Sequence, residues 1–386
     1  MGVFSLFGRY KNKKMKIKPF SIERYFAKHE FSAPYLLSCS DAEPLSLSEL
    51  LGMADAESQQ LWDNLSLGYT ESQGHPGLLQ AIAHLYPGIT TQNILGVVPE
   101  EGIFISMNML LEAGDHVIVT HPGYQSLYQI AVSIGCNVSW WEPHLQTDMA
   151  FYMSDLESLI TPKTKLIVIN FPHNPTGSLI SKQQQSELVR IAQENKITIF
   201  SDEMYRFAEL DAADRLPSMV ERYEKGVVLG GLSKSFSLPG LRVGWLASQD
   251  MDFIRAAMAF KDYTTICAAA PSEILGMIAL ESKDKIFKRN LAIYQNNLSA
   301  LEEFFTLNNT NFRWVQPKSG TIIFPEITGD MSADELCQKL LDQSGVMLLP
   351  ASILGYDGNY VRIGFGRRDL PENLDKFDEF LNDLKK

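Results

Sequence analysis

Lys234 and Arg242 stand eight residues apart, with a Pro-Gly pair at residues 239–240 between them. The lysine closely follows a short apolar run at residues 227–229, which is typical of a buried strand. A lysine amine can form an imine with an aldehyde, and an arginine can bind an anion through two hydrogen bonds. The pair therefore suggests a small ligand with an aldehyde and a phosphate, although a lysine near a strand end is more often a solvated surface residue.

Asn174 follows a second strand-like run. Residues 164–170 are apolar and rich in branched side chains, as in a buried parallel strand, and residues 172–177 then read Pro-His-Asn-Pro-Thr-Gly. Asn-Pro followed by Thr-Gly indicates a turn. Open α/β sheets bind ligands at the carboxyl ends of their strands, so Asn174 is either a turn former or a hydrogen-bonding partner of a ligand.

Asp202 comes two residues after the end of the next apolar run, residues 197–200, and Tyr205 stands three residues further on. A carboxylate at the end of a buried strand costs free energy unless it has a partner. A protonated pyridine nitrogen would supply that partner, and the aspartate would keep the ring cationic and able to accept electrons. Tyr205 could then reach a ring hydroxyl. The alternative for Asp202 is the N-cap of a helix.

These segments together resemble the fold-type-I enzymes that use pyridoxal 5′-phosphate (PLP), specifically the class I/II aminotransferase family, from about residue 65 to residue 367. The resemblance implies PLP as the cofactor and gives each candidate a role: Lys234 forms the imine, Asp202 pairs with the pyridine nitrogen, and Asn174 and Tyr205 hold the ring hydroxyl. Lys234, Asp202 and Tyr205 are then the expected catalytic residues.

Four further residues match the family's motifs. Arg242 matches the phosphate arginine, and Tyr124 matches the aromatic residue that stacks on the ring. Arg362 matches the arginine that binds the substrate α-carboxylate, for which a planar fork of donors is suited; Asn174 is the second expected substrate contact. Tyr69 matches the tyrosine that reaches the phosphate of the neighbouring subunit. A homodimer is therefore expected.

The phosphate-binding segment departs from the family. Residues 98–102, just before a helix predicted at 103–112, read Val-Pro-Glu-Glu-Gly where relatives carry a glycine- and serine-rich loop. Pro99 has no N–H to donate and Glu100 would repel a phosphate, yet proline is normal at a first helical position and the following amides can face an anion. Glu100 is therefore a candidate cofactor contact that either turns outward or faces the substrate. Gly231 stands where many relatives carry a phosphate-binding serine.

Asp41 and Glu43 occupy a region where relatives usually carry a glycine-rich stretch beside the substrate. Two carboxylates near a substrate mouth would favour a cationic side chain, either an amine or a guanidinium. The alternative is a solvated acidic loop. No counterpart is found for the arginine that some relatives use to bind a dicarboxylate side chain, so aspartate is only one candidate donor.

The composition is that of an ordinary globular protein. The 386 residues allow a large core and two domains. A formal net charge of −12 argues against nucleic acid as a partner. The four cysteines lie far apart in the sequence, which favours the reducing cytoplasm over a disulfide framework.

No apolar stretch reaches the roughly 20 residues of a membrane span. The basic residues 1–20 are expected to form a frayed arm, with Met1 or Met15 as its start.

Strand and helix patterns alternate along much of the chain, which predicts an α/β fold with a mostly parallel sheet between helices; by the resemblance the sheet is of the seven-stranded type, with a smaller α+β domain. Strands are expected at residues 115–120, 138–141, 165–170, 197–202, 226–229 and 243–248. Helices are expected at 46–61, where Ser46 and Glu49 fit a capping box, and at 77–86, 154–160, 181–195 and 269–307.

Three parts of the chain are predicted. Residues 1–45 form an N-terminal arm that contributes to the small domain and the mouth of the active site, residues 46–270 form the large PLP-binding domain, and residues 271–386 form an interdomain helix and the small C-terminal domain. The last part has strand patterns at 321–324, 346–349 and 360–363 and helix patterns at 332–344 and 371–384.

The predicted reaction is transamination between an amino acid and a 2-keto acid. By the resemblance, Arg362 orients the substrate and the freed amine of Lys234 removes the α-carbon proton. The same residues also support β-elimination, racemisation, ring-forming replacement or oxygen-dependent deamination, with a basic amino acid as one substrate. A PLP-sensing regulator would need roughly 70–100 further N-terminal residues with a recognition helix. An inactive scaffold would not need the set of site residues.

Overall fold

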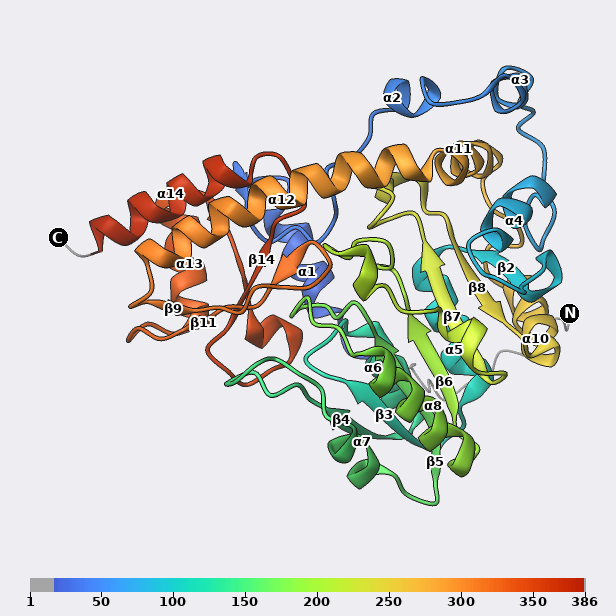
Figure 1. Cartoon of the computed structure of the whole chain (residues 1–386), viewed down its shortest axis with the longest axis horizontal. Coiled ribbons are helices and arrows are strands. Elements are labelled where there is room, and N and C mark those ends of the chain that lie inside the picture. Colours follow the sequence, from blue (N-terminus) through green and yellow to red (C-terminus); the bar gives the residue numbers. More distant parts are fainter. Residues whose placement is uncertain (1–16, 385–386) are drawn as a thin grey trace, which may run out of the picture.

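Seven strands form the central sheet of the structure, a computed structural model that describes residues 17–384 (Figure 1). Their order is β2 (Ile94–Val97), β8 (Gly244–Ser248), β7 (Gly226–Gly231), β6 (Thr198–Asp202), β5 (Thr164–Asn170), β3 (His116–Thr120) and β4 (Asn137–Trp141). The pairs from β7 through β4 are parallel, and only β8 pairs antiparallel with its two neighbours. The predicted α/β class with a mostly parallel seven-stranded sheet is confirmed.

Both faces of this sheet are covered by helices because successive side chains alternate between two cores. On β5, Leu166 and Val168 enter one core and Ile167 and Ile169 the other. The first core is shared with α5 (Pro99–Leu110), α6 (Ser126–Ile134) and α10 (Met251–Lys261), and the second with α4 (Pro76–Ala83), α7 (Met153–Leu159), α8 (Lys182–Asn195), α9 (Met219–Arg222) and α11 (Ala270–Glu281). With both faces covered, the strand ends remain free to carry polar side chains.

The helix α12 (Lys283–Leu307) joins this layered part to the C-terminal elements (Figure 1). Its 25 residues correspond to a length of about 37 Å. Ile286 packs in the core beside the large sheet, whereas Leu301 packs in a separate core with C-terminal elements. These elements are α13 (Ala333–Ser344), α14 (Leu370–Asp383), β9 (Phe312–Arg313), β10 (Ile322–Ile323), β11 (Glu326–Ile327), β12 (Val346–Met347), β13 (Leu349–Pro350) and β14 (Val361–Gly364). The domain boundaries at residues 45 and 270 stay predictions.

The described N-terminal residues pack against these C-terminal elements. The helix α1 (Ser21–His29), which the sequence patterns did not predict, buries Ile22 in a core with Leu349 and Leu354. The hydroxyl of Tyr25 donates to the carbonyl of Leu348 at 2.7 Å. Next, β1 (Tyr35–Leu36) pairs in parallel with β12. The chain from α1 to β1 is thereby held beside β14, although it is far from β14 in sequence.

Three predicted helices have different boundaries in the structure. The segment 46–61 is two helices, α2 (Leu47–Leu51) and α3 (Ala56–Asp63), because α2 ends at Gly52 and Asp55 caps a new helix; the capping box of Ser46 is confirmed. The segment 269–307 is also two helices, α11 and α12, which meet at Ser282. The helix predicted from residue 103 begins at Pro99, so residues 99–102 are its first turn rather than a loop.

The predicted basic arm lies mostly in residues 1–16, outside the described part of the chain. β2 and α10 were not predicted, and the short helices η1 (Thr91–Asn93), η2 (Ala212–Asp214), η3 (Pro239–Leu241) and η4 (Ala351–Leu354) complete the structure. From residue 17 to residue 384, the structure contains no helix with the length and apolar character needed to cross a membrane.

Candidate active site

A cavity of about 410 Å³ lies where β5, β6 and β7 end, next to α1, the start of α5 and β14. It brings together eight of the nine predicted site residues: Asn174, Asp202, Tyr205, Lys234, Arg242, Tyr124, Glu100 and Arg362. The ninth, Tyr69, does not line it and is 92% exposed. Segments as far apart in sequence as Ile22 and Arg362 therefore converge on one cavity.

Lys234 stands three residues after β7 and is half-buried. Its Nζ donates a hydrogen bond of 2.8 Å to Oγ of Ser40 and lies 5.8 Å from the centre of the Tyr205 ring. The carbonyl of Ser40 accepts a hydrogen bond of 3.0 Å from the Tyr205 hydroxyl. Ser40, which the sequence reasoning missed, therefore holds both the amine and the phenol at the cavity.

Asp202 is the last residue of β6 and is only 6% exposed. Its Oδ1 accepts the amide N–H of Met204 at 3.0 Å, and a turn rather than a helix follows, so the N-cap alternative does not hold. Burial raises the pKa of Asp202 to about 7, against the opposing effects of the Met204 amide and the charge of Lys234. In the absence of a cationic partner, the charged form of this carboxyl is therefore disfavoured.

Asn174 is held by Asn170, the last residue of β5. The amide Nδ2 of Asn170 donates to the carbonyl of Asp202 at 3.0 Å, and its Oδ1 accepts the Asn174 amide N–H at 2.9 Å. Oδ1 of Asn174 is buried and has no hydrogen-bond partner within residues 17–384. Asn170 thus ties the ends of two neighbouring strands to the turn that carries Asn174. The sequence offered one signal for it, an asparagine at the end of a buried strand.

Arg242 follows η3 with a left-handed backbone, φ +55°, which a non-glycine residue adopts at a cost of roughly 1 kcal/mol or more. Its Nη1 donates to the carbonyl of Pro239 at 3.1 Å. Ser233, which was not predicted, lines the same cavity, and its buried Oγ has no partner among the described residues. These groups and the first amides of α5 are the donors available to an anion.

The two glutamates in the first turn of α5 make different contacts. The carboxylate of Glu101 accepts the Val98 amide at 3.1 Å and the Thr265 amide at 3.2 Å. Glu100 lines the cavity, where burial raises its pKa and the neighbouring Ser126 and Tyr124 hydroxyls oppose that shift. Of the two orientations considered for Glu100, the structure shows the inward one. Gly102 lets this end of α5 approach the sheet, since a Cβ there would lie 2.9 Å from Leu229.

Arg362 lies in the middle of β14 and is 2% exposed. Its Nη2 donates to the carbonyl of Ser38 at 2.9 Å, whereas its buried Nε has no partner within the described chain. β14 can lie this close to residues 37–40 because Gly364 has no side chain; a Cβ there would overlap the Cys39 carbonyl oxygen at 1.8 Å. A buried guanidinium with a free donor is suited to a carboxylate ligand.

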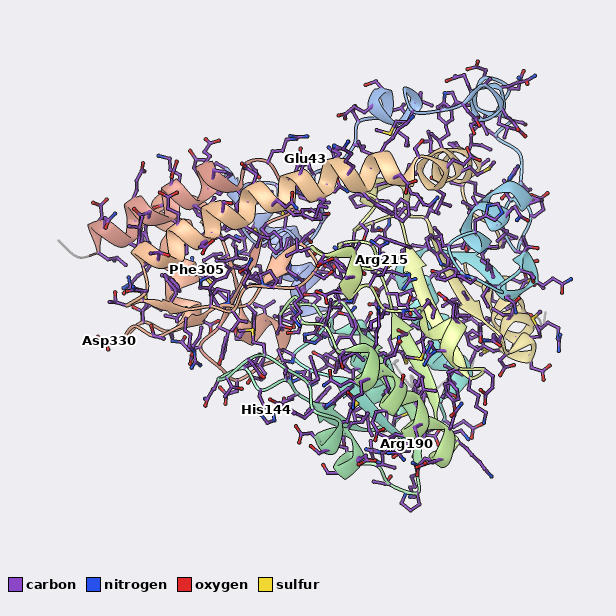
Figure 2. All side chains as sticks on the ribbon, viewed as in Figure 1. Glu43, His144, Arg190, Arg215, Phe305 and Asp330 are labelled. Atoms are coloured by element: carbon purple, nitrogen blue, oxygen red, sulfur yellow. The ribbon has the colours of Figure 1, made fainter. Side chains whose placement is uncertain are left out.

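The acidic pair predicted beside the substrate is arranged differently. Asp41 lines the cavity but forms a bidentate ion pair with Arg367. Nε of Arg367 donates to Oδ1 of Asp41 and Nη2 donates to Oδ2, each at 3.0 Å. Glu43 does not line the cavity; it lies beside α12 (Figure 2), where its carbonyl accepts Nη1 of Arg289 at 2.8 Å. The prediction that Asp41 and Glu43 supply unpaired negative charge beside the substrate is therefore wrong. Instead, Glu23 and Glu30 reach the cavity from α1 and its C-terminal end.

Comparisons with known proteins agree with this geometry. The family model "Aminotransferase class I and II" matches residues 46–376. A solved PLP-dependent aminotransferase from Streptococcus suis 89-1591 superposes with a TM-score of 0.89 at 32% identity, covering 96% of this chain and 99% of its own. Capreomycidine synthase from Streptomyces vinaceus is 26% identical over 93% of this chain and 91% of its own. A solved PLP-dependent cyclase, OrfR, has a TM-score of 0.86 at 26% identity and covers 95% of this chain and 97% of its own.

The match to the family model spans most of the chain, and the solved aminotransferase covers nearly all of it. Similarity on this scale includes the strands and loops that carry the cavity residues. The predicted family and cofactor are thus confirmed. The chain belongs to the class I and II aminotransferase family, and its cofactor is PLP.

Proposed function

We propose that this protein catalyses transamination, moving an α-amino group from an amino acid to a 2-keto acid. The observation that carries the proposal is that a lysine amine, a buried carboxylate and a buried arginine with a free donor open into one cavity: Lys234, Asp202 and Arg362. The test is to add single amino acids to the PLP-loaded protein without a keto acceptor. Formation of one 2-keto acid per active site supports the proposal, and no keto acid from any donor opposes it.

The residues of the cavity fit PLP. Three buried polar atoms that line it have no partner within residues 17–384: Oδ1 of Asn174, Oγ of Ser233 and Nε of Arg362. Such atoms are costly unless a ligand or water binds them. Lys234 would hold the aldehyde carbon, Asp202 the pyridine nitrogen, Asn174 and Tyr205 the ring hydroxyl, Arg242 and the α5 amides the phosphate, and Tyr124 a face of the ring.

When bound, PLP supplies a cationic ring that accepts the electrons of the bond broken at the substrate α-carbon. Asp202 would keep the ring nitrogen protonated, because the protonated nitrogen is the cationic partner that the buried carboxylate of Asp202 is expected to have. Arg362 would orient the α-carboxylate, and the Lys234 amine would take the α-carbon proton as general base. The donor would leave as a 2-keto acid before a second 2-keto acid enters, so ping-pong kinetics are expected.

Replacing Arg362 with lysine is expected to lower kcat/KM for the amino donor by roughly 10- to 100-fold, because lysine keeps the charge but loses the planar two-donor fork. The cofactor absorption should stay unchanged. Arg255→Lys, on the exposed face of α10, is the matched control. An Arg362→Lys protein with the kcat/KM of the parent would show that the α-carboxylate binds elsewhere.

A homodimer is proposed because Tyr69 is exposed and does not line the cavity of its own chain. Residues 70–72 lie against residues 266–268, as shown by the hydrogen bonds from Thr70 to the Ala268 carbonyl and from Ser72 to the Ile266 carbonyl. Four large side chains in or within three residues of these segments are exposed: Leu67, Tyr69, Tyr263 and Ile266. Large apolar side chains exposed on neighbouring segments are typical of a protein interface, here with a second copy of the chain.

Tyr69→Phe is expected to raise the dissociation constant for PLP by roughly 10- to 100-fold, since it removes a hydrogen bond to a charged phosphate. The dimer should persist in sedimentation, because only the hydroxyl is lost. Tyr152→Phe, a partly exposed tyrosine whose hydroxyl binds Asp148, is the control. A fully active monomer, or unchanged PLP affinity in Tyr69→Phe, would contradict the shared site.

Ring-forming replacement is a second candidate, favoured by the similarity to a PLP-dependent cyclase and to capreomycidine synthase. The two reactions share Lys234 and Asp202 and differ in the fate of the amino group. A cyclising enzyme would return a product that still contains the α-nitrogen and would release no 2-keto acid. Mass spectrometry of the product from each donor, together with the keto-acid yield, separates the two.

A further inference from the structure

We propose that Glu23, Glu30 and Glu100 form a pocket for a cationic substrate side chain, an amine or a guanidinium. This inference rests on the proposed function, since it concerns the amino acid whose α-carboxylate Arg362 would bind. It replaces the predicted acidic pair, Asp41 and Glu43, with carboxylates that the structure places in the cavity.

One side of α1 and the residue after it supply two of these carboxylates. Glu23, Phe26 and Glu30 are spaced by three and four residues, so they share one side of the helix, and all three line the cavity. The Phe26 ring lies 5.7 Å from the guanidinium carbon of Arg362. The acidic side of α1 is therefore next to the arginine expected to hold the substrate, while Glu100 enters from α5.

The charged side chains around the cavity leave these three glutamates without an ion-pair partner. Asp41 is paired with Arg367, and Asp202 is expected to pair with the ring nitrogen. Within residues 17–384, none of the ion pairs at 4.0 Å or less includes Glu23, Glu30 or Glu100. The cations Lys234, Arg242 and Arg362 have expected roles at the aldehyde, the phosphate and the α-carboxylate.

A second observation shows that this space is a ligand site. Arg362 is almost completely buried and lines the same cavity, with its Nε unpartnered in the described chain. Burial raises the pKa of Glu30 and of Glu100, although Arg367 and Arg242 respectively offset part of each shift. A cation bound between them would stabilise their charged forms. The carboxylate side chain of aspartate or glutamate would be repelled instead.

The test compares L-arginine with L-citrulline, which has the same length without the charge, in the PLP-loaded enzyme. L-Ornithine and L-glutamate extend the series in charge. For each amino acid, calorimetry gives the dissociation constant and single-turnover assays give the keto-acid yield. Arginine is expected to bind at least about tenfold more tightly than citrulline, as for hydrogen bonds to a charged group, and glutamate should not bind.

Glu23→Gln and Glu30→Gln, singly and together, should bring the arginine-to-citrulline ratio towards one without changing the cofactor spectrum. Glu57→Gln on the exposed side of α3 changes the charge equally and should leave the ratio unchanged. Equal binding of arginine and citrulline, with keto acid formed from both, overturns the cationic pocket and leaves transamination in place. Preferential binding of arginine without keto acid overturns transamination and supports the pocket. Binding of neither amino acid overturns the cationic pocket, and transamination is then decided by the keto-acid yield from the remaining donors.

Discussion

Lys234→Ala is expected to slow keto-acid formation by roughly 10⁴-fold or more, because the variant loses a general base, which alone contributes about 10²- to 10⁴-fold, and also the covalent attachment of the cofactor. The amine faces the cavity through its 2.8 Å hydrogen bond to Ser40, and no other lysine lines that cavity within residues 17–384. The measurement is single-turnover formation of 2-keto acid from the preferred donor. It should be accompanied by the visible absorption of the bound cofactor, which should change in the variant.

Two comparisons separate chemistry from folding. Lys182→Ala, at the exposed start of α8, should keep the full rate. Adding a small primary amine to Lys234→Ala should restore part of the lost rate, since the space left by the side chain can admit a base. A Lys234→Ala protein that retains a rate within tenfold of the parent would show that another group removes the proton.

The large sheet was predictable because its signals are local. Each parallel strand is a short apolar run, and polar site residues stand at the end of three of them or within four residues of it: Asn174 after β5, Asp202 at the end of β6 and Lys234 after β7. Parallel strands present their carboxyl ends at one edge, so these residues had to meet. The register confirms this, since Asn170 pairs with Asp202 and Asp202 pairs with Leu229.

The remainder of the site depends on contacts that no local pattern encodes. Ser40 binds Lys234 across 194 positions, and Arg367 neutralises Asp41 across 326. Because the sequence near Asp41 does not show that Arg367 lies beside it, the Asp41 carboxylate was predicted to be unpaired. Glu23 and Glu30 were missed because α1 has only nine residues, a length at which a helix depends on packing, here on η4 and β13. The site roles themselves stay predictions until they are measured.

Asp202→Asn is the second large effect expected. With PLP bound, the variant leaves the ring cation buried without its carboxylate, which costs roughly 3–5 kcal/mol, or about 10²- to 10⁴-fold in kcat. Asparagine preserves the shape, and its side-chain oxygen can still accept the Met204 amide, as Oδ1 of Asp202 does at 3.0 Å. The loss should therefore reflect charge. Asp375→Asn on the exposed side of α14 should keep the parental kcat.

Without cofactor, the same substitution should stabilise the fold, and the effect should depend on pH. Burial raises the folded-state pKa of Asp202 to about 7, whereas the unfolded value is about 3.9, so the folded protein binds the extra proton between those values. The proton on Asp202 adds to the free energy of unfolding, and this contribution of roughly 4 kcal/mol is lost as the pH rises from about 4 to about 7. Asparagine does not ionise, so the variant does not lose stability in this way.

The free energy of unfolding of cofactor-free Asp202→Asn should therefore match the parent near about pH 4 and exceed it by up to roughly 4 kcal/mol near about pH 8. Denaturant titrations of both proteins at the two pH values measure the difference. PLP should reverse the order at the higher pH, since only the parent gains an ion pair with the ring. Equal stabilities at both pH values would show that the carboxyl titrates normally, and the argument for its pairing with the ring nitrogen would then lose its physical basis.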